Sequence, residues 1–306
     1  MLSFIGRRLL SAIPTLFVII TISFFLIRLA PGGPFDLERP LEAKVMENLN
    51  RIYKLDRSLF EQYLLYLGAV VRGDFGPSFI MRDFSVRELF AQGLPISITL
   101  GSLAIGLAIL VGGTLGVTAA LRQNTVADYI VTGLGAMGLT IPNFVVAPIF
   151  QIVFGLTLAW LPLSGWNGGA PRNLVLPVIV LALPQIAVIA RMTRAAMIEN
   201  LRSNHIRTLR SLGLPTRVVV GHALRGAALP VVSYLGPAAA ALLTGSVVVE
   251  TIFGLPGIGR YFVEGALNRD YTLVMGTVVV VAVFVLLFNL VVDILYALID
   301  PRIRFD

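Results

Sequence analysis

Residues 273–298 read L-V-M-G-T-V-V-V-V-A-V-F-V-L-L-F-N-L-V-V-D-I-L-Y-A-L, and this stretch decides the class of the protein. Asp293 is its only side chain that is charged at neutral pH. A helix needs about 20 mostly apolar residues to cross the roughly 30 Å of hydrocarbon in a bilayer. Five further stretches satisfy that requirement, at 9–29, 96–121, 129–158 (interrupted by Pro142 and Pro148), 174–190 and 228–249. The sequence therefore predicts an all-α polytopic membrane protein with six transmembrane helices.

The composition supports a membrane environment. Of 306 residues, 57% are hydrophobic and 13% are charged, and the mean hydropathy is +0.86. Soluble domains carry about 25% charged residues, so about half of the usual charge is missing. The net charge of +7 is compatible with nucleic-acid binding, but the positions of the arginines indicate membrane orientation instead, and we expect no nucleic-acid partner. Cysteine is absent, which excludes disulfides and cysteine-ligated metal sites.

The polar segment 31–95 is the one stretch outside the spans that could fold by itself. The span before it begins with Arg7 and Arg8, as a signal peptide does, but its apolar run is longer than a signal peptide's and no cleavage pattern follows. We therefore expect an uncleaved signal-anchor. The predicted division is 1–95, a signal-anchor helix with a periplasmic segment, and 96–306, a five-helix core with a cytoplasmic loop at 191–227.

Lysine and arginine in short loops predict the orientation, because cytoplasmic loops carry an excess of them. The segment 191–225 contains seven arginines and a single acid, Glu199. Each terminus carries two more arginines: Arg7 and Arg8, and Arg302 and Arg304. Six spans with both termini in the cytoplasm satisfy this pattern. The longer segment 31–95 then lies outside, where long loops escape the rule.

No catalytic, nucleotide or metal motif is found. Neither lysine, Lys44 or Lys54, lies in a phosphate-binding loop, and His205 and His222 are 17 residues apart, which matches no metal-ligand spacing. The G-x-G-x-x-G of 133–138 lies inside an apolar span, so it indicates close helix packing, as does Gly112-x-x-x-Gly116. We expect this chain to bind no metal or cofactor.

The segment between the fourth and fifth spans contains a short predicted helix. Ser203 is a candidate N-cap, Gly213 a candidate C′ residue and Pro215 a stop. The helix carries Ile206, Leu209 and Leu212 on one face, flanked by Arg207 and Arg210. An exposed apolar stripe is typical of a docking surface, whereas a basic amphipathic helix also suits an anionic lipid surface. The pattern alone does not choose between these two interpretations.

Several sequence motifs decide between the docking and the lipid-surface interpretations. They include R-R-L-L-S-A-I-P-T-L (7–16), I-R-L-A-P-G-G-P (27–34), G-D-F-G-P-S (73–78), I-R-T-L-R-S-L-G-L-P (206–215), H-A-L-R (222–225), V-E-T-I-F-G-L-P-G-I-G (249–259), L-N-R-D-Y (267–271) and I-D-P-R-I-R (299–304). With these motifs the chain resembles, from end to end, the inner-membrane permease subunits of peptide-family ATP-binding-cassette importers, and most closely the oligopeptide branch.

The resemblance implies a type I importer permease in the bacterial inner membrane, forming half of a path that carries oligopeptides or dipeptides from periplasm to cytoplasm. It implies four kinds of partner: a homologous second permease subunit in a heterodimer, two ATPase subunits that bind the ATP and Mg²⁺, a periplasmic peptide-binding protein, and membrane lipid.

In that family the 203–215 helix is the coupling helix that docks on the ATPase. The residues expected to couple are Ile206, Arg207, Thr208, Leu209, Arg210, Leu212 and Gly213. The wider permease signature begins Glu-Ala-Ala, whereas this chain has Arg207-Thr208-Leu209 at that place.

Polar residues within spans are candidates for the translocation path, since they are costly in hydrocarbon and face the bundle interior. They are Asn143, Gln151, Gln185, Thr244, Asn289 and Asp293. For Asn289 and Asp293, four residues apart, interhelical hydrogen bonding is the favoured alternative. Glu250 is expected at a membrane boundary. Gly257, Arg260, Arg269 and Asp270 are expected at the periplasmic mouth, beside a short helix.

Two other classes of protein fit the sequence less well. A stand-alone secondary transporter or channel often shows repeated halves and charged residues at the bilayer midplane, and this chain shows no repeat and little such charge. A membrane enzyme would need a nucleophile, base or metal cluster, for which there is no candidate.

Overall fold

The computed structural model describes residues 2–29, 46–48, 51, 53–81 and 83–299. Within these residues the chain is helical and forms no β-strand; a single bridge joins Pro77 to Ser85. The all-α prediction is confirmed. Lys44, Arg302 and Arg304 lie outside the described residues, as does most of the sequence motif at 27–34.

Five of the helices are long and apolar enough to cross a membrane. They are α1 (Leu2–Leu29), α4 (Val86–Leu121), α7 (Pro171–Leu201), α9 (Thr216–Leu243), which α10 (Val247–Ile252) prolongs, and α12 (Tyr271–Ile299). The sixth predicted span is a bent pair, α5 (Val126–Thr140) and α6 (Asn143–Phe150), and a turn of π-helix at Gln151–Thr157 follows α6. Counting the bent pair as one span gives six, as predicted.

The bend within the sixth span is 102°. It lies at Ile141 and Pro142, which separate α5 from α6. Proline disfavours the helical conformation of the residue before it, and Ile141 is extended, with φ −86° and ψ 116°. The sequence thus indicates the place of the break, although not its angle.

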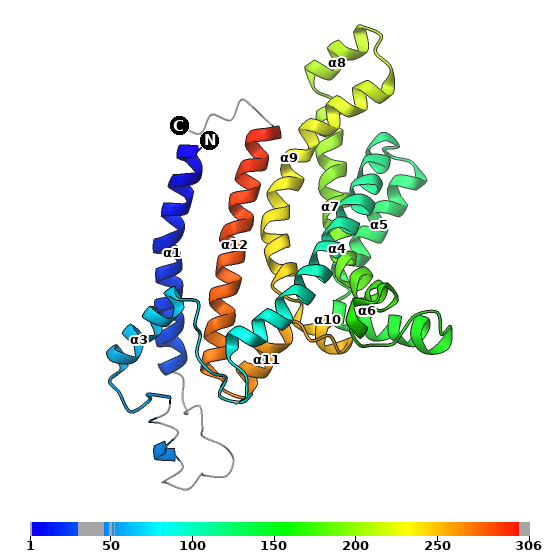
Figure 1. The fold of residues 1–306 in the computed structure, drawn as a ribbon. Coiled ribbons are helices and arrows are strands. Elements are labelled where there is room, and N and C mark those ends of the chain that lie inside the picture. Colours follow the sequence, from blue (N-terminus) through cyan, green and yellow to red (C-terminus); the bar gives the residue numbers. More distant parts are fainter. Residues whose placement is uncertain (1, 30–45, 49–50, 52, 82, 300–306) are drawn as a thin grey trace.

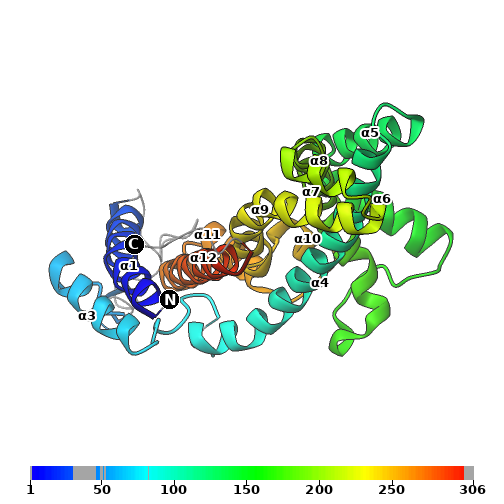
Figure 2. The ribbon, with the colours of Figure 1, turned by 90° about the horizontal axis from the view of Figure 1, so that it is seen from above.

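The ends of the bundle differ in what they carry. Figure 1 shows the first residues of α1, the last turns of α12 and the short helix α8 (Asn204–Ser211) at one end. The helices α3 (Leu59–Val71) and α11 (Ile258–Leu267) lie at the other end. Viewed from above, α1 and α12 lie on one side of the molecule and α5 and α6 on the other (Figure 2). Both described chain ends therefore share the side of the arginine-rich segment, and the assignment of that side to the cytoplasm stays a prediction.

α4 begins earlier than expected. Ser85 and Glu88 form a capping box: the Ser85 hydroxyl accepts from the Glu88 N–H, and the Glu88 carboxylate accepts from the Ser85 N–H at 2.8 Å. Two orphan donors at the helix start are satisfied in this way. α4 is continuous from Val86 through Pro95, so the predicted boundary between residues 95 and 96 falls inside a helix.

The centre of the fold is the packing of α4 on α7. A Cβ placed on Gly112 would lie 2.8 Å from the Ile186 carbonyl oxygen, and one on Gly116 would lie 2.6 Å from that of Ala190. Only glycine allows the two backbones to approach this closely. The predicted packing role of Gly112-x-x-x-Gly116 is confirmed. In 133–138 the prediction holds for Gly138, which faces Ala187, but Gly133 has no neighbour within 4 Å among the described residues.

Candidate functional site

The helix α8 stands at the tip of a helical hairpin. α7 runs on to Leu201, eleven residues past the expected end of the fourth span, and α9 begins at Thr216, so α8 is held between two long helices. α8 has eight residues and ends as predicted, with Gly213 at φ +71° after it. Ser203 lies at the N-cap position, but its hydroxyl donates to the Asn200 carbonyl at 2.5 Å and caps no N–H.

The predicted apolar stripe of α8 does not face outward as a unit. Ile206 is 0% exposed and packs with Met197 of α7 and with Val219 and Ala223 of α9. Leu209 is half-buried against the same cluster, whereas Leu212 is 70% exposed. The prediction that all three form an exposed docking face is wrong for Ile206, because so short a helix needs an anchor on its own chain.

The outward side of α8 is basic and polar, with one leucine at its end. The exposed residues are Asn204, His205, Arg207, Thr208, Arg210, Ser211 and, just after the helix, Leu212. Arg207 and Arg210 form no ion pair with any residue that the structure describes. Arg210 lies in the last turn, where the helix dipole favours a cation. The surface offers two free guanidinium groups beside an exposed apolar side chain.

One arginine of the segment is turned inward. Arg194 of α7 donates from Nε to Oδ1 of Asp128 at 2.5 Å and from Nη2 to Oδ2 at 2.7 Å. Asp128, in the first turn of α5, is 2% exposed. The two residues are 66 positions apart, and no local pattern indicates their pairing.

The polar side-chain atoms of three predicted path residues form hydrogen bonds within this chain. Gln151 donates to the carbonyls of Leu163, at 2.8 Å, and Ile252, at 3.0 Å. Gln185 accepts a hydrogen bond from the Tyr234 hydroxyl, which joins α7 to α9. The Thr244 hydroxyl donates to the Ala240 carbonyl at 2.7 Å. The bonds of Gln151 and Gln185 join separate segments, whereas that of Thr244 lies within the last turn of α9. A role of the three residues in the path stays a prediction.

Asn289 and Asp293, near the end of α12, lie in different environments. Asp293 forms an ion pair with Arg8 of α1, with 3.0 Å between Oδ2 and Nε. This is the interhelical contact that was the favoured alternative to the path. Asn289 is exposed and lines, with Thr244, a cavity of 630 Å³ bordered by α1, α10, α11 and α12.

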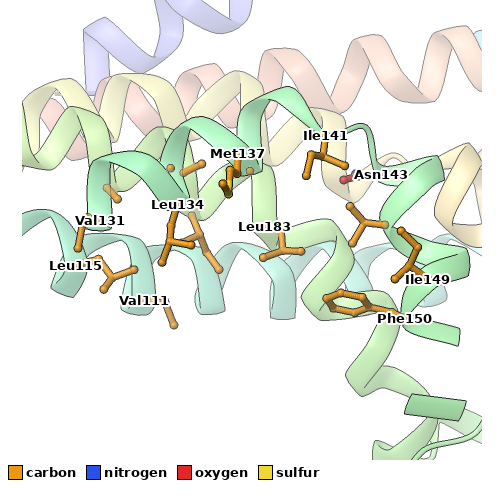
Figure 3. A pocket seen from close by; sticks show the side chains of 16 residues that line it. Val111, Leu115, Val131, Leu134, Met137, Ile141, Asn143, Ile149, Phe150 and Leu183 are labelled. Carbon is orange, nitrogen blue, oxygen red and sulfur yellow. The ribbon is translucent and has the colours of Figure 1, made fainter. Parts of the chain in front are cut away.

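Asn143 lies at the break of the bent span. It lines a cavity of 480 Å³ enclosed by α4, α5, α6 and α7. Figure 3 shows its side chain among apolar ones, including Leu134, Met137 and Phe150. Among the lining residues that the structure describes, it alone has a polar side chain.

Two of the four predicted mouth residues are interior. Asp270 is 0% exposed; its Oδ2 accepts from the Ser78 hydroxyl at 2.5 Å and its Oδ1 from the Leu273 N–H at 3.1 Å. It joins the segment after α3 to the start of α12. Gly257 is buried, whereas Arg260 and Arg269 are exposed, and Arg260 pairs with Glu264 of its own helix at 2.6 Å. Asp270 and Gly257 are therefore packed inside this chain, and the place of the four residues at the periplasmic mouth stays a prediction.

The buried carboxylate of Glu250 explains why the motif G-L-P-G-I-G (254–259) needs its last two glycines. This carboxylate is 1% exposed and accepts from the Ser97 hydroxyl at 2.7 Å and from the Arg260 N–H at 3.3 Å. A Cβ on Gly257 would lie 2.3 Å from its carboxyl carbon, and one on Gly259 would lie 3.0 Å from Oε2. The loop therefore closes around the carboxylate only with glycine at these positions. Glu250 lies two residues before the end of α10, and its expected place at a membrane boundary stays a prediction. The spacing of the glycines was the signal for its burial.

Comparison with known proteins identifies the family. Residues 112–305 match the sequence profile of "Binding-protein-dependent transport system inner membrane component", and residues 1–95 match that of the N-terminal region of such membrane components. The chain belongs to this family of inner membrane components. Its helices account for a multi-pass membrane protein, and the family places it in the inner membrane.

Individual relatives are similar over their whole length. The chain is 54% identical over 306 residues, all of both chains, to "Oligopeptide transport system permease protein OppB" of Escherichia coli (strain K12). It is 51% identical over 306 residues, again all of both chains, to the protein of the same name in Haemophilus influenzae. It is 42% identical over 299 residues, 97% of this chain and 96% of the other, to "Dipeptide transport system permease protein DppB" of Bacillus subtilis.

Proposed function

We propose that this chain is a permease subunit of an ATP-binding-cassette importer and forms half of the path that carries oligopeptides, or dipeptides, into the cytoplasm. The relatives named for oligopeptide and dipeptide transport support the substrate class. The observation that carries the mechanism is α8, a short helix anchored to the chain by Ile206, with Arg207, Arg210 and Leu212 outside. A helix of this kind can transmit force from a soluble subunit into α7 and α9.

The energy source in this proposal is ATP bound, with Mg²⁺, by two separate ATPase subunits. This chain contains no phosphate-binding loop, and no group of three or more metal-ligating side chains occurs among its described residues. An ATPase groove that receives α8 would present an apolar pocket to Leu212. It would present carboxylates or backbone carbonyls to Arg207 and Arg210, because a guanidinium donates to such acceptors.

The remaining partners follow from the same proposal. A homologous second permease subunit supplies the other half of the path, and a periplasmic peptide-binding protein delivers substrate to the end that carries α3 and α11. The permease binds no catalytic cofactor and acts as a non-catalytic component. The arginine-rich end faces the cytoplasm under the positive-inside rule.

The deciding experiment replaces Leu212 by Glu in the assembled importer. A buried anchor of an interface contributes about 2 kcal/mol or more, so ATPase binding should weaken roughly thirtyfold or more, and peptide uptake should fall with it. Leu121→Glu is a matched control, because Leu121 is also exposed and lies at the end of α4. Unchanged ATPase co-purification and uptake in Leu212→Glu would contradict the proposal.

The alternative, a secondary transporter or channel working alone, has its own test. The purified chain, reconstituted without other subunits, should move no peptide across a vesicle membrane. Peptide uptake by the chain alone would replace the proposed function with this alternative.

A further inference from the structure

The polar attachment of α5 is concentrated at one residue. Among the side-chain hydrogen bonds of the described residues, those at Asp128 alone join α5 to another helix. Its carboxylate accepts two N–H groups of Arg194 and the Asn124 N–H at 3.0 Å. Asp128 also lies in the first turn of α5, where the helix dipole stabilises an anion. The start of α5 is thus tied to α7 in both position and orientation.

The arginine of this pair belongs to the same packed unit as α8. Arg194 lies seven residues before the end of α7, and α8 starts three residues after that end. Burial of Ile206 holds α8 on α7 and α9. α7 is also fixed to α4 beside Arg194, since a Cβ on Gly116 would lie 2.6 Å from Cβ of Thr193. A displacement of α8 therefore displaces Arg194.

The rest of α5 is held more loosely. Beyond Asp128 it faces the 480 Å³ apolar cavity against α4 and α7 (Figure 3). A cavity wall forfeits the interlocking contacts that resist sliding. α5 then ends at the 102° bend before α6. α5 meets α7 again at Gly138, where an added Cβ would lie 3.2 Å from Cβ of Ala187, but this contact joins small apolar residues. A single polar attachment at its start, a cavity along its length and a bend at its end leave α5 able to pivot.

We propose that the Asp128–Arg194 ion pair is the positioning contact through which motion of α8 reaches the broken span α5–α6. The inference rests on the proposed function, in which ATPase subunits move α8. A guanidinium bound to a carboxylate by two parallel bonds fixes an angle as well as a distance, which a lysine ammonium does not. Arg194→Lys should therefore retain only part of the coupling.

A distance measurement tests the attachment itself, without transport. The chain has no cysteine, so spin labels can be placed at Leu134→Cys on α5 and Ser211→Cys on α8, both exposed positions. In the chain reconstituted in nanodiscs, Asp128→Asn should broaden or shift the distance distribution between the labels. Arg202→Gln is the matched control, because its bond to Gln123 is exposed and longer, at 3.3 Å. An Asp128→Asn distribution equal to that of the labelled parent would overturn the inference.

The second measurement separates coupling from stability in the complete importer, with both permeases, the ATPases and the binding protein in proteoliposomes. Coupling energies carried by connected side chains correspond to about two- to thirtyfold effects. Peptide uptake per ATP hydrolysed should fall by that factor in Asp128→Asn, less in Arg194→Lys and not in Arg202→Gln, with assembly and hydrolysis retained.

The outcomes distinguish this inference from the function on which it rests. Uptake and hydrolysis that fall together, or loss of assembly, would show a merely structural ion pair and overturn the inference. Absence of peptide uptake by the unmodified importer would instead defeat the proposed function, and the label distances would still decide whether the pair holds α5.

Discussion

Short helices occur at both ends of the bundle, and they are held in opposite ways. α8 is anchored by an apolar side chain, Ile206, and leaves its arginines outside. At the other end, the loop between α10 and α11 is closed around a buried carboxylate, that of Glu250, by glycines and by Ser97. The proposed docking surface on α8 leaves its guanidinium groups without ion-pair partners among the described residues, whereas the loop around Glu250 uses its polar groups in internal hydrogen bonds.

The largest effect is expected when Ile206, the apolar anchor of α8, is truncated. Truncating a buried isoleucine to alanine costs about 2–5 kcal/mol, so Ile206→Ala should loosen α8 and lower the midpoint of thermal unfolding of the purified chain. Leu212→Ala is the matched control: Leu212 is exposed, so its loss should change stability by less than about 0.5 kcal/mol while weakening ATPase binding. Equal unfolding midpoints for the two variants would show that α8 has no anchor on its own chain.

An intermediate effect is expected when the loop that closes around the Glu250 carboxylate is disturbed. The added methyl group of Gly257→Ala would overlap the Glu250 carboxyl group, and overpacking of this kind costs about 1–3 kcal/mol. The unfolding midpoint should fall, and proteolysis between α10 and α11 should become faster. Gly221→Ala, where no neighbour lies within 4 Å among the described residues, should leave the midpoint unchanged or raise it. If both variants behaved alike, the closure around Glu250 would not be the constraint at Gly257.

The smallest effect concerns the ion pair between α1 and α12. Arg8 is half exposed, and exposed pairs contribute about 0–1 kcal/mol, so Asp293→Asn should shift the unfolding midpoint only slightly. Peptide uptake by the assembled importer should persist, because the geometry gives Asp293 a role between helices. Loss of peptide uptake without loss of stability would indicate that Asp293 contributes to the translocation path.

Much of the fold could be predicted from the sequence because the spans, the prolines and the ends of α8 are local signals. Pro142 marks the bend, and Gly213 marks the end of α8. The early start of α4 could also be predicted from the sequence, since Ser85 and Glu88 have the spacing of a capping box.

The site was less predictable for a physical reason. Periodicity shows that Ile206 needs an apolar partner but not whether that partner belongs to the same chain. The contacts of Gln151, Gln185 and Asp128 join residues brought together only by the packing of the helices. A polar residue in a span must find a partner, and the sequence does not say which.

Site-specific cross-linking tests the outward face of α8 most directly. Because the chain has no cysteine, a thiol-reactive photocrosslinker can be attached to Leu212→Cys or Ile206→Cys within the assembled importer. The label at position 212 should cross-link to an ATPase subunit, and the label at position 206 should form adducts only within this chain. ATPase adducts at position 206 with none at position 212 would contradict the orientation of α8 and the coupling route built on it.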